Sequence, residues 1–371
     1  MAHATSTDMP ICLFCVTSSR SGIGDGFLSL ANAMPPGSNI VVVKGDPYQD
    51  AEFNVPSDRI LSASFSIRSP LSYLSIRNWK RLFYFLKQHN VDHLFFYSTA
   101  PINSLTVMMV RHLSFSLWCH DPLPHPGEPI HIVLPKEIDQ RLLFQSVRCK
   151  QVFVCSHFLK KLLITHRNVS PSKITCCPLP VIEEITKHAK RIDYKDREFD
   201  IIFWGRVETY KGLDVLGNAL LRMQKEGHVF KTLIVGRGPL DAFIPTELIS
   251  SSAVTIKNRY VENAELADDI CRSKVAVFPY RSSTGTHTVQ TSLALGCRVV
   301  ASDVGSFREL LTTEVVNAGS LVPPEDPAAL ADTLMGVLAL PDHDPTAAQG
   351  FAEQFAPTRW AEAIMKKVRQ Q

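Results

Sequence analysis

The sequence lacks the long apolar runs that mark membrane spans. None of its apolar stretches reaches the ~18 uninterrupted residues that a transmembrane helix needs. The first ten residues, MAHATSTDMP, contain no basic segment followed by an apolar core, so we expect no secretory signal. These absences favour a protein that works in the cytoplasm.

Cysteine is present, but not in the patterns that bind zinc or form disulfide frameworks. The nine cysteines are odd in number, and the single CxxC, Cys12 to Cys15, has no second CxxC to pair with it. Several lie within apolar runs, where a thiol behaves as a small hydrophobe. We therefore expect no metal site and a reducing compartment.

Acidic residues are scarce in two stretches of the first half. Residues 1–182 carry a net charge of +6, whereas residues 183–371 carry −3. No acid occurs in 62–91 or in 140–182, which contain five and seven Lys or Arg residues. This asymmetry is typical of a protein with an anionic partner, such as a phospholipid surface, a phosphorylated acceptor or nucleic acid. An ordinary solvated basic face is the equal alternative.

Short apolar runs rich in β-branched residues alternate with helical patterns along the chain. Such strand–helix–strand units predict parallel sheets covered on both faces. The pattern restarts after a highly charged segment, so we predict two Rossmann-like α/β lobes that face a cleft. The predicted parts are an N-terminal acceptor-binding domain 1–182, a linker 183–198, a C-terminal nucleotide-binding domain 199–350, and a terminal helix 351–371 that crosses back to the first domain.

The segment FDIIFWGRVETYKGLDVL carries the strongest motif. A predicted strand ends at Gly205, Arg206 follows at once, and Lys211 comes five residues later. Ligands of open parallel sheets bind at the carboxyl ends of the strands. Arg grips two phosphate oxygens in a fork and Lys acts as a mobile point charge, so this pair suits a diphosphate. A loop with two solvated cations is the alternative.

A loop of small residues follows a later predicted strand, VAVFPY. It contains Thr284, Gly285 and Thr286 and leads into the helical pattern VQTSLALG. Backbone N–H groups at the start of a helix can hold sugar hydroxyls or a phosphate.

The order of these motifs resembles that of the family 4 glycosyltransferases of the GT-B fold. GRxxxxKG is followed by a strand ending G-x-G-P, by YVENAELADDICRSKVAVFPY, and by a loop leading to LALGCRVVASDVGSFREL. The resemblance is strong over 199–311 and weaker before it, where WCHDP and VFVCSHFLKKLL match. A divergent exopolysaccharide glycosyltransferase family related to family 4 fits equally.

The resemblance implies a role for each matching residue. Arg206 and Lys211 match the pair that binds the donor diphosphate, and Gly22 and Gly24 match an N-terminal loop facing the same phosphates. The loop of Thr284, Gly285 and Thr286 matches the one whose amides hold the donor sugar. His120 matches a histidine beside the transferred sugar.

The sequence departs from the family at two glutamates eight positions apart. Ser283 and Thr291 stand at these positions, so Thr291 replaces the glutamate that contacts the nucleotide ribose. This leaves the stereochemistry, retaining or inverting, open. It also favours a second hypothesis, a non-catalytic GT-B subunit or scaffold that binds nucleotide. A third, an NAD-dependent enzyme, is disfavoured because no clean GxGxxG follows the first strand.

The loop HDPLPHPGEP follows the predicted strand FSLWC. An inverting transferase needs a general base, for which a carboxylate serves. Asp121 and Glu128 are the candidates beside His120, although Asp121 is as readily explained as a turn cap. The one DxD triplet, at residues 342–344, lies outside the stretch that resembles the family, and the resemblance implies metal-independent transfer without a cofactor.

We therefore predict a hexosyltransferase that uses a UDP- or GDP-sugar and a glycan or lipid-linked acceptor in polysaccharide or glycolipid synthesis. Aromatic and aliphatic residues interleave with cations in 62–91, which predicts peripheral binding to the cytoplasmic face of an anionic membrane. No groove-reading or base-stacking module indicates nucleic acid. The residues offered for membrane contact are Phe65, Leu71, Tyr73, Leu74, Trp79, Leu82, Phe83, Tyr84 and Phe85. The competing account is that most of the aromatic side chains pack in the core of the first domain and leave only the basic face exposed.

Overall fold

The computed structural model describes residues 10–16, 22–65, 70–123, 136–311, 319–341, 350–351 and 353–370. The chain divides into two compact units, residues 1–178 with 357–371, and residues 179–356. Each unit is built on a parallel sheet, so the predicted α/β class with two Rossmann-like domains is confirmed.

The first unit contains a seven-stranded sheet of order β3-β2-β1-β4-β5-β6-β7, with every described pairing parallel. Its strands are β1 (Ile11–Cys15), β2 (Ile40–Lys44), β3 (Ile60–Ser62), β4 (His93–Phe96), β5 (Ser114–Trp118), β6 (Cys149–Val154) and β7 (Ile174–Cys176). Its helices are α1 (Gly22–Asn32), α2 (Ile76–Gln88), α3 (Pro101–Met109), α4 (Lys136–Phe144), α5 (His157–Arg167) and α14 (Pro357–Arg369).

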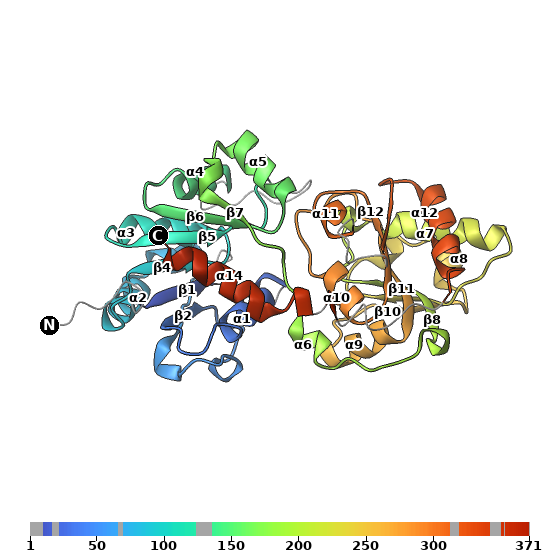
Figure 1. Cartoon of the computed structure of the whole chain (residues 1–371), viewed down its shortest axis with the longest axis horizontal. Coiled ribbons are helices and arrows are strands. Elements are labelled where there is room, and N and C mark those ends of the chain that lie inside the picture. The colour runs from blue at the N-terminus through green and yellow to red at the C-terminus, as the bar shows by residue number, and fades with distance from the viewer. Residues whose placement is uncertain are drawn as a thin grey trace. The chain divides into compact units, whose positions relative to one another are not determined.

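Two groups of helices cover the faces of this sheet. Side chains from α2, α3, α4 and α5 share one buried cluster with strand residues such as Phe14 and Phe96. On the other face α14 lies beside α1 (Figure 1), and Trp360 of α14 packs edge-on against Tyr97 and Trp118. The last helix of the chain therefore completes the first unit.

Helix α2 shows why this segment folds as it does. Ser75 caps it by accepting a hydrogen bond from the amide of Asn78 at 3.3 Å. Trp79, Leu82 and Phe85 recur every three or four residues and are buried. Most of the residues that the sequence analysis offered for membrane contact are therefore core residues. Of that set, Leu71, Leu74 and Tyr84 are exposed.

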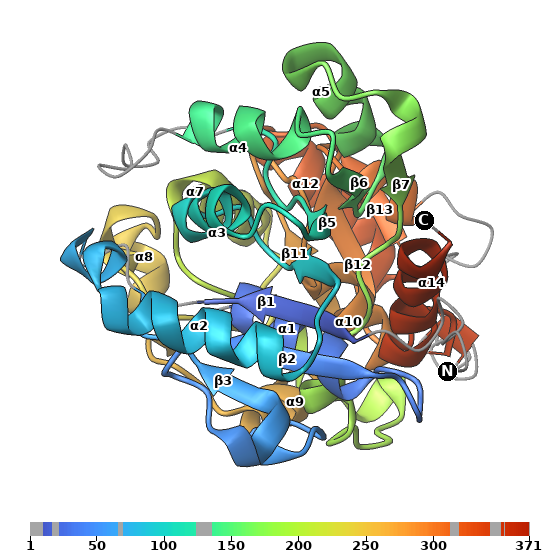
Figure 2. The same ribbon diagram turned by 90° about the vertical axis from the view of Figure 1, so that its left-hand side faces the viewer.

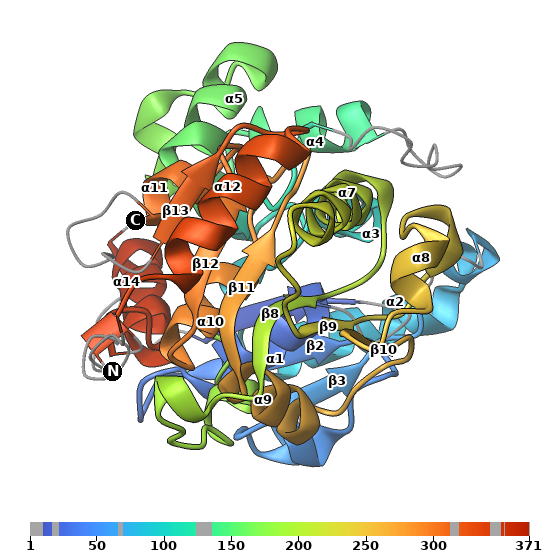
Figure 3. The same cartoon turned by 90° about the vertical axis from the view of Figure 1, so that its right-hand side faces the viewer.

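The second unit contains a six-stranded parallel sheet of order β10-β9-β8-β11-β12-β13. Its strands are β8 (Phe199–Trp204), β9 (Thr232–Val235), β10 (Val254–Lys257), β11 (Ser273–Phe278), β12 (Arg298–Ser302) and β13 (Gly319–Val322). Its helices are α6 (Glu183–Thr186), α7 (Leu213–Lys225), α8 (Thr246–Ile249), α9 (Asn263–Cys271), α10 (Thr288–Ala294), α11 (Phe307–Leu311) and α12 (Pro327–Leu338). Figure 3 shows α7 and α12 side by side on this sheet.

The segment 183–198 differs from the linker that its charge predicts. It forms α6 and the short 3-10 helix Tyr194–Asp196, and both Ile185 and Tyr194 are buried in the second unit. Most of the charged side chains of this segment face solvent, and a few apolar side chains pack it against the second unit. Among the described residues, no helix is long and apolar enough to cross a membrane.

Candidate functional site

The loops after strands β8, β9 and β11 are held together by close backbone contacts. Gly212 has φ +66°, and a Cβ there would lie 1.9 Å from the carbonyl oxygen of Pro279. A Cβ on Gly236 would lie 1.8 Å from the carbonyl oxygen of Gly205. Only glycine allows these approaches, so the GRVETYKG loop is fixed against its neighbours at the carboxyl end of the sheet.

Lys211 is a buried cation at the centre of these loops. Lys211 is the last residue of the 3-10 helix Thr209–Lys211 and is 7% exposed. Its Nζ donates a hydrogen bond to the hydroxyl of Tyr280 at 2.8 Å and lies 4.5 Å from the centre of that ring. Burial lowers the pKa of Lys211 from its ordinary value. Within the described part of the chain, no carboxylate forms an ion pair with it.

Lys44 of β2 is a second buried lysine, and its ammonium group has several partners within the protein. It is 2% exposed, and its Nζ forms an ion pair with Asp50 at 2.9 Å. The same Nζ donates to the Tyr48 carbonyl oxygen at 2.5 Å and to Ser62 Oγ at 2.7 Å. Lys211 has hydroxyl and aromatic neighbours in place of a carboxylate. A buried cation with such neighbours can still take an anion from outside as its partner.

Tyr280 connects Lys211 to the loop of small residues. It follows β11, is 1% exposed, and has the side chains of Thr286 and Thr288 near its hydroxyl group. The Oγ1 atoms of these threonines lie 2.9 Å apart, and the Thr288 amide donates to Thr286 Oγ1 at 3.2 Å. The sequence analysis did not single out Tyr280. Its position at the end of a strand, directly before the loop, is the signal that could have found it.

Arg206 lies on the surface of the same loop. Its side chain is 75% exposed and forms an ion pair with Glu208 at 2.9 Å. An exposed pair of this kind contributes about 0–1 kcal/mol, so a phosphate can replace Glu208 at little cost. Arg281 is already engaged, because it donates two hydrogen bonds to Asp214, at 2.9 and 2.6 Å.

The predicted sugar-binding loop lies beside this cluster, and Thr291 does not. Thr284 and Thr286 are partly exposed and Gly285 is exposed. Thr291 is fully buried in α10, and its Oγ1 accepts a hydrogen bond from the amide of Ile182 at 3.0 Å. Because Thr291 is 0% exposed, its side chain packs inside the second unit and does not face a ligand.

Gly22 and Gly24 lie in the first turn of α1, where the sequence analysis placed them in a loop. Gly22 has open space around it, whereas a Cβ on Gly24 would lie 2.2 Å from the Tyr48 hydroxyl oxygen. Tyr48 also donates to Asp25 Oδ1 at 2.9 Å. Gly24 therefore serves the packing of Tyr48, and Gly22 is the position of the two that a ligand can approach.

His120 and Asp121 follow β5 in the first unit. Nε2 of His120 lies 2.9 Å from the Tyr97 carbonyl oxygen, which can only accept, so Nε2 carries the proton. Burial lowers the pKa of His120, which favours the neutral ring with Nδ1 as an acceptor. The Asp121 carbonyl oxygen accepts from Gln140 Nε2 at 2.7 Å. Glu128 lies outside the described residues.

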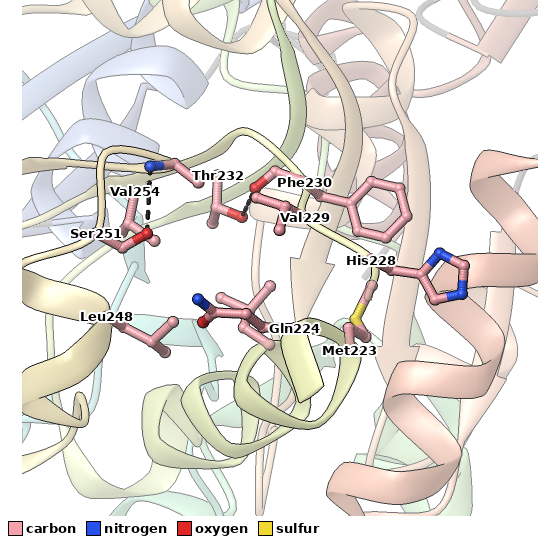
Figure 4. Close-up of a pocket in the computed structure, with 11 residues that line it drawn as sticks. Met223, Gln224, His228, Val229, Phe230, Thr232, Leu248, Ser251 and Val254 are labelled. Carbon is pink, nitrogen blue, oxygen red and sulfur yellow. Dashed lines mark hydrogen bonds between the residues drawn. The ribbon is translucent and has the colours of Figure 1, made fainter. Parts of the chain in front are cut away.

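A small cavity in the second unit does not belong to this site. It lies between α7, α8 and the start of strands β9 and β10, where Figure 4 shows Met223, Gln224, Leu248 and Thr232 around it. Thr232 is the first residue of β9, so the cavity is at the amino ends of the strands. Among the described residues, no group of three or more His, Cys, Asp or Glu side chains is placed to hold a metal.

Comparison with known proteins finds a family match within the second unit. Residues 198–339, which contain the whole Lys211 cluster, match the family Glycosyl transferases group 1. The second unit is therefore similar to this family. The resemblance to the GT-B glycosyltransferases that the motifs indicated is therefore confirmed.

A curated relative agrees with this family match. The D-inositol 3-phosphate glycosyltransferase of Salinispora tropica is 30% identical over 158 residues, which cover 39% of this chain. The match spans about a third of that relative, 32% of its length.

Two solved structures are similar over nearly the whole chain. HepE from Anabaena, in complex with UDP and glucose, has a TM-score of 0.72 at 13% identity and covers 98% of this chain and 100% of its own. Sucrose-phosphate synthase from Thermosynechococcus elongatus has a TM-score of 0.68 at 16% identity and covers 98% of each chain. At such identities the likeness establishes the GT-B fold.

Proposed function

We propose that this protein is a glycosyltransferase that moves a hexose from a UDP- or GDP-sugar to a hydroxyl group of a glycan or lipid-linked acceptor. The observation that carries the proposal is Lys211, a buried cation without a carboxylate partner at the carboxyl end of a group 1 glycosyltransferase sheet. HepE, which has a similar fold, was solved in complex with UDP and glucose. This supports a uridine nucleotide as the carrier of the donor sugar.

In this proposal Lys211 and Arg206 bind the donor diphosphate and stabilise the charge that develops on it as the sugar departs. Tyr280 holds the Lys211 ammonium group in place through its hydroxyl. The amides of Thr284, Gly285 and Thr286 orient the donor sugar. Because the two cations and the loop amides meet the phosphate charge, we propose that transfer needs neither a metal ion nor a cofactor.

The first unit would supply the acceptor side. His120 is neutral and offers Nδ1 as an acceptor to a sugar hydroxyl. If the reaction inverts the anomeric centre, Asp121 or Glu128 is the general base that removes the acceptor proton. We propose that the protein works in the cytoplasm, at the inner face of a membrane where polysaccharide or glycolipid precursors are made.

A non-catalytic nucleotide-binding subunit is the second candidate. Ser283 and Thr291 stand where the resembling family has glutamates, so the carboxylates of that family are missing. Ser283 is buried, and Thr291 Oγ1 accepts a hydrogen bond from the Ile182 amide. A scaffold would keep the diphosphate site while lacking turnover.

The test combines binding with turnover. The purified protein is melted with UDP, GDP and their hexose conjugates, and a ligand of the native state raises the melting temperature. Release of UDP or GDP is then followed with candidate acceptors. Stabilisation by one nucleotide with release supports the transferase, and stabilisation without release under any acceptor supports the scaffold. Absence of stabilisation by every nucleotide would refute both.

A further inference from the structure

The outward side of helices α2 to α5 combines cations with large exposed apolar side chains. We propose that this surface, called the basic face below, binds an anionic lipid bilayer. Figure 2 shows α2, α3, α4 and α5 in succession towards the top of the view, and their inner sides share one buried cluster. The proposal deepens the proposed function by stating where a lipid-linked acceptor would be met, but it is carried by the surface itself.

Helix α2 and the turn before it provide the apolar part of the basic face. Leu71 is 77% exposed and Leu74 75% exposed, although both are large aliphatic residues. Ile76 and Tyr84, each 71% exposed, are eight residues apart on α2, with Lys80 midway between them. Residues four apart lie on one stripe of a helix, so Ile76, Lys80 and Tyr84 point the same way. Arg77 and Arg81 are exposed beside this stripe.

The same character continues across the neighbouring helices. Met108 and Met109 at the end of α3 are 58% and 51% exposed, and Arg111 follows them. On α4, which packs against α3, Leu142 is 47% exposed beside the exposed Arg141. The basic face therefore extends from α2 over α3 and α4, which follow one another in Figure 2.

Negative charge is absent from the described side chains of the basic face. Two acids occur within these helices. Asp139 is 2% exposed and accepts a hydrogen bond from Ser104 Oγ, and the side chain of Glu137 in α4 lies outside the described residues. The cations Arg77, Lys80 and Arg81 are therefore not neutralised by neighbours on their own surface. Apolar side chains that enter the headgroup layer, flanked by cations that meet lipid phosphates, are the pattern of interfacial helices.

The alternatives fit less well. The centre of a protein–protein interface is depleted in Lys, whereas here Lys80 lies between the exposed apolar residues. Single-stranded nucleic acid is bound by exposed aromatic residues on which bases stack, and the exposed apolar residues here are mainly aliphatic. An anionic bilayer satisfies both components of the surface.

The experiment is co-sedimentation of the full chain with vesicles, without donor or acceptor. Vesicles of phosphatidylcholine alone and with about a third phosphatidylglycerol are compared at low and high salt. The test variant carries Arg77→Gln, Lys80→Gln and Arg81→Gln. The matched control removes the same charge from exposed lysines of the second unit, with Lys195→Gln, Lys225→Gln and Lys231→Gln. A second test variant, Leu71→Ser with Leu74→Ser, keeps every charge.

We expect the wild type and the control to sediment with anionic vesicles at low salt and to stay in solution with neutral ones. Each cation near such a surface contributes about 1 kcal/mol, so the triple test variant should lose about a hundredfold in partition coefficient, at about 1.4 kcal/mol per tenfold. The Leu71/Leu74 variant should also bind more weakly. Wild-type protein that stays in solution in every case, or a triple variant that binds as the control does, overturns the proposal.

A single-stranded RNA oligonucleotide serves as a competitor for the same face. Displacement of the protein from vesicles by this RNA at equal phosphate concentration would overturn the assignment of a bilayer, and failure to displace it would support that assignment. None of these measurements involves the donor site, so a negative result leaves the proposed transferase untouched. If the protein binds vesicles but no nucleotide, the proposed transferase activity is refuted and the proposed membrane binding by the basic face is retained.

Discussion

Replacing Lys211 by methionine should weaken nucleotide binding without destabilising the fold. Methionine has nearly the length of lysine and packs in apolar surroundings. The substitution removes a buried charge whose pKa is already lowered by burial, so the free energy of unfolding should be unchanged or higher. The charge-assisted contact with a diphosphate is lost at the same time.

The magnitude follows from the contact that disappears. A hydrogen bond to a charged group contributes about 1.5–3 kcal/mol, so the Kd for UDP should rise about 10- to 150-fold. Arg206→Gln should raise the Kd for UDP within the same range. Within the protein it removes an exposed ion pair with Glu208, which contributes little to stability. Neither change should lower the melting temperature of the unliganded protein.

The assay is isothermal titration with UDP or GDP, together with thermal melting of the unliganded variants. Lys44→Met is the matched control, because Lys44 is equally buried but has a carboxylate partner and two further acceptors. It should lower the melting temperature and leave nucleotide affinity unchanged. If Lys211→Met behaved like Lys44→Met, Lys211 would be a structural residue and the site assignment would be wrong.

Three further outcomes are expected. Activity should persist in EDTA, measured as release of UDP or GDP, because Arg206 and Lys211 meet the phosphate charge; loss that Mg²⁺ or Mn²⁺ restores would contradict this. Tyr280→Phe removes the acceptor of the 2.8 Å bond from Lys211 and should weaken UDP binding about two- to tenfold; unchanged affinity would separate Tyr280 from the site. Burial holds the pKa of His93 at about 4 against 6.5 in an unfolded chain, so only the unfolded chain takes up a proton as pH falls from 6.5 to 4. Stability should therefore drop by about 3 kcal/mol over that range, and His93→Asn should show a smaller drop in melting temperature between pH 7 and pH 4.5 than the wild type.

The sheets could be predicted from the sequence because their central strands are continuous apolar runs. Strands such as ICLFC and FDIIFW are buried on both faces. The short strands Ile60–Ser62 and Ile174–Cys176 were missed, because three residues at the edges of a sheet carry no periodic signal.

The site was predicted in part, for a similar reason. Arg206 and Lys211 lie where a strand-end motif predicts, but their different surroundings, one exposed and one buried, depend on contacts from β11 that are distant in sequence. Tyr280 contributes through such a contact, 69 residues from Lys211. For the aromatic residues of 62–91 the sequence left both membrane contact and core packing open, because an amphipathic pattern does not say which apolar residues fill the core.

The return of the chain to its first unit fixes the order in which the protein can be completed during synthesis. Helix α14 is made only after residues 179–356, and Trp360 is the side chain that packs on Tyr97 and Trp118. At about 5–20 residues per second, the ribosome needs roughly 10–35 s for that stretch. Throughout this interval the first sheet exists without its last helix. A chain that stops shortly before Pro357 therefore has a complete second unit and a defective first one, so a late premature stop damages the unit that was synthesised earliest.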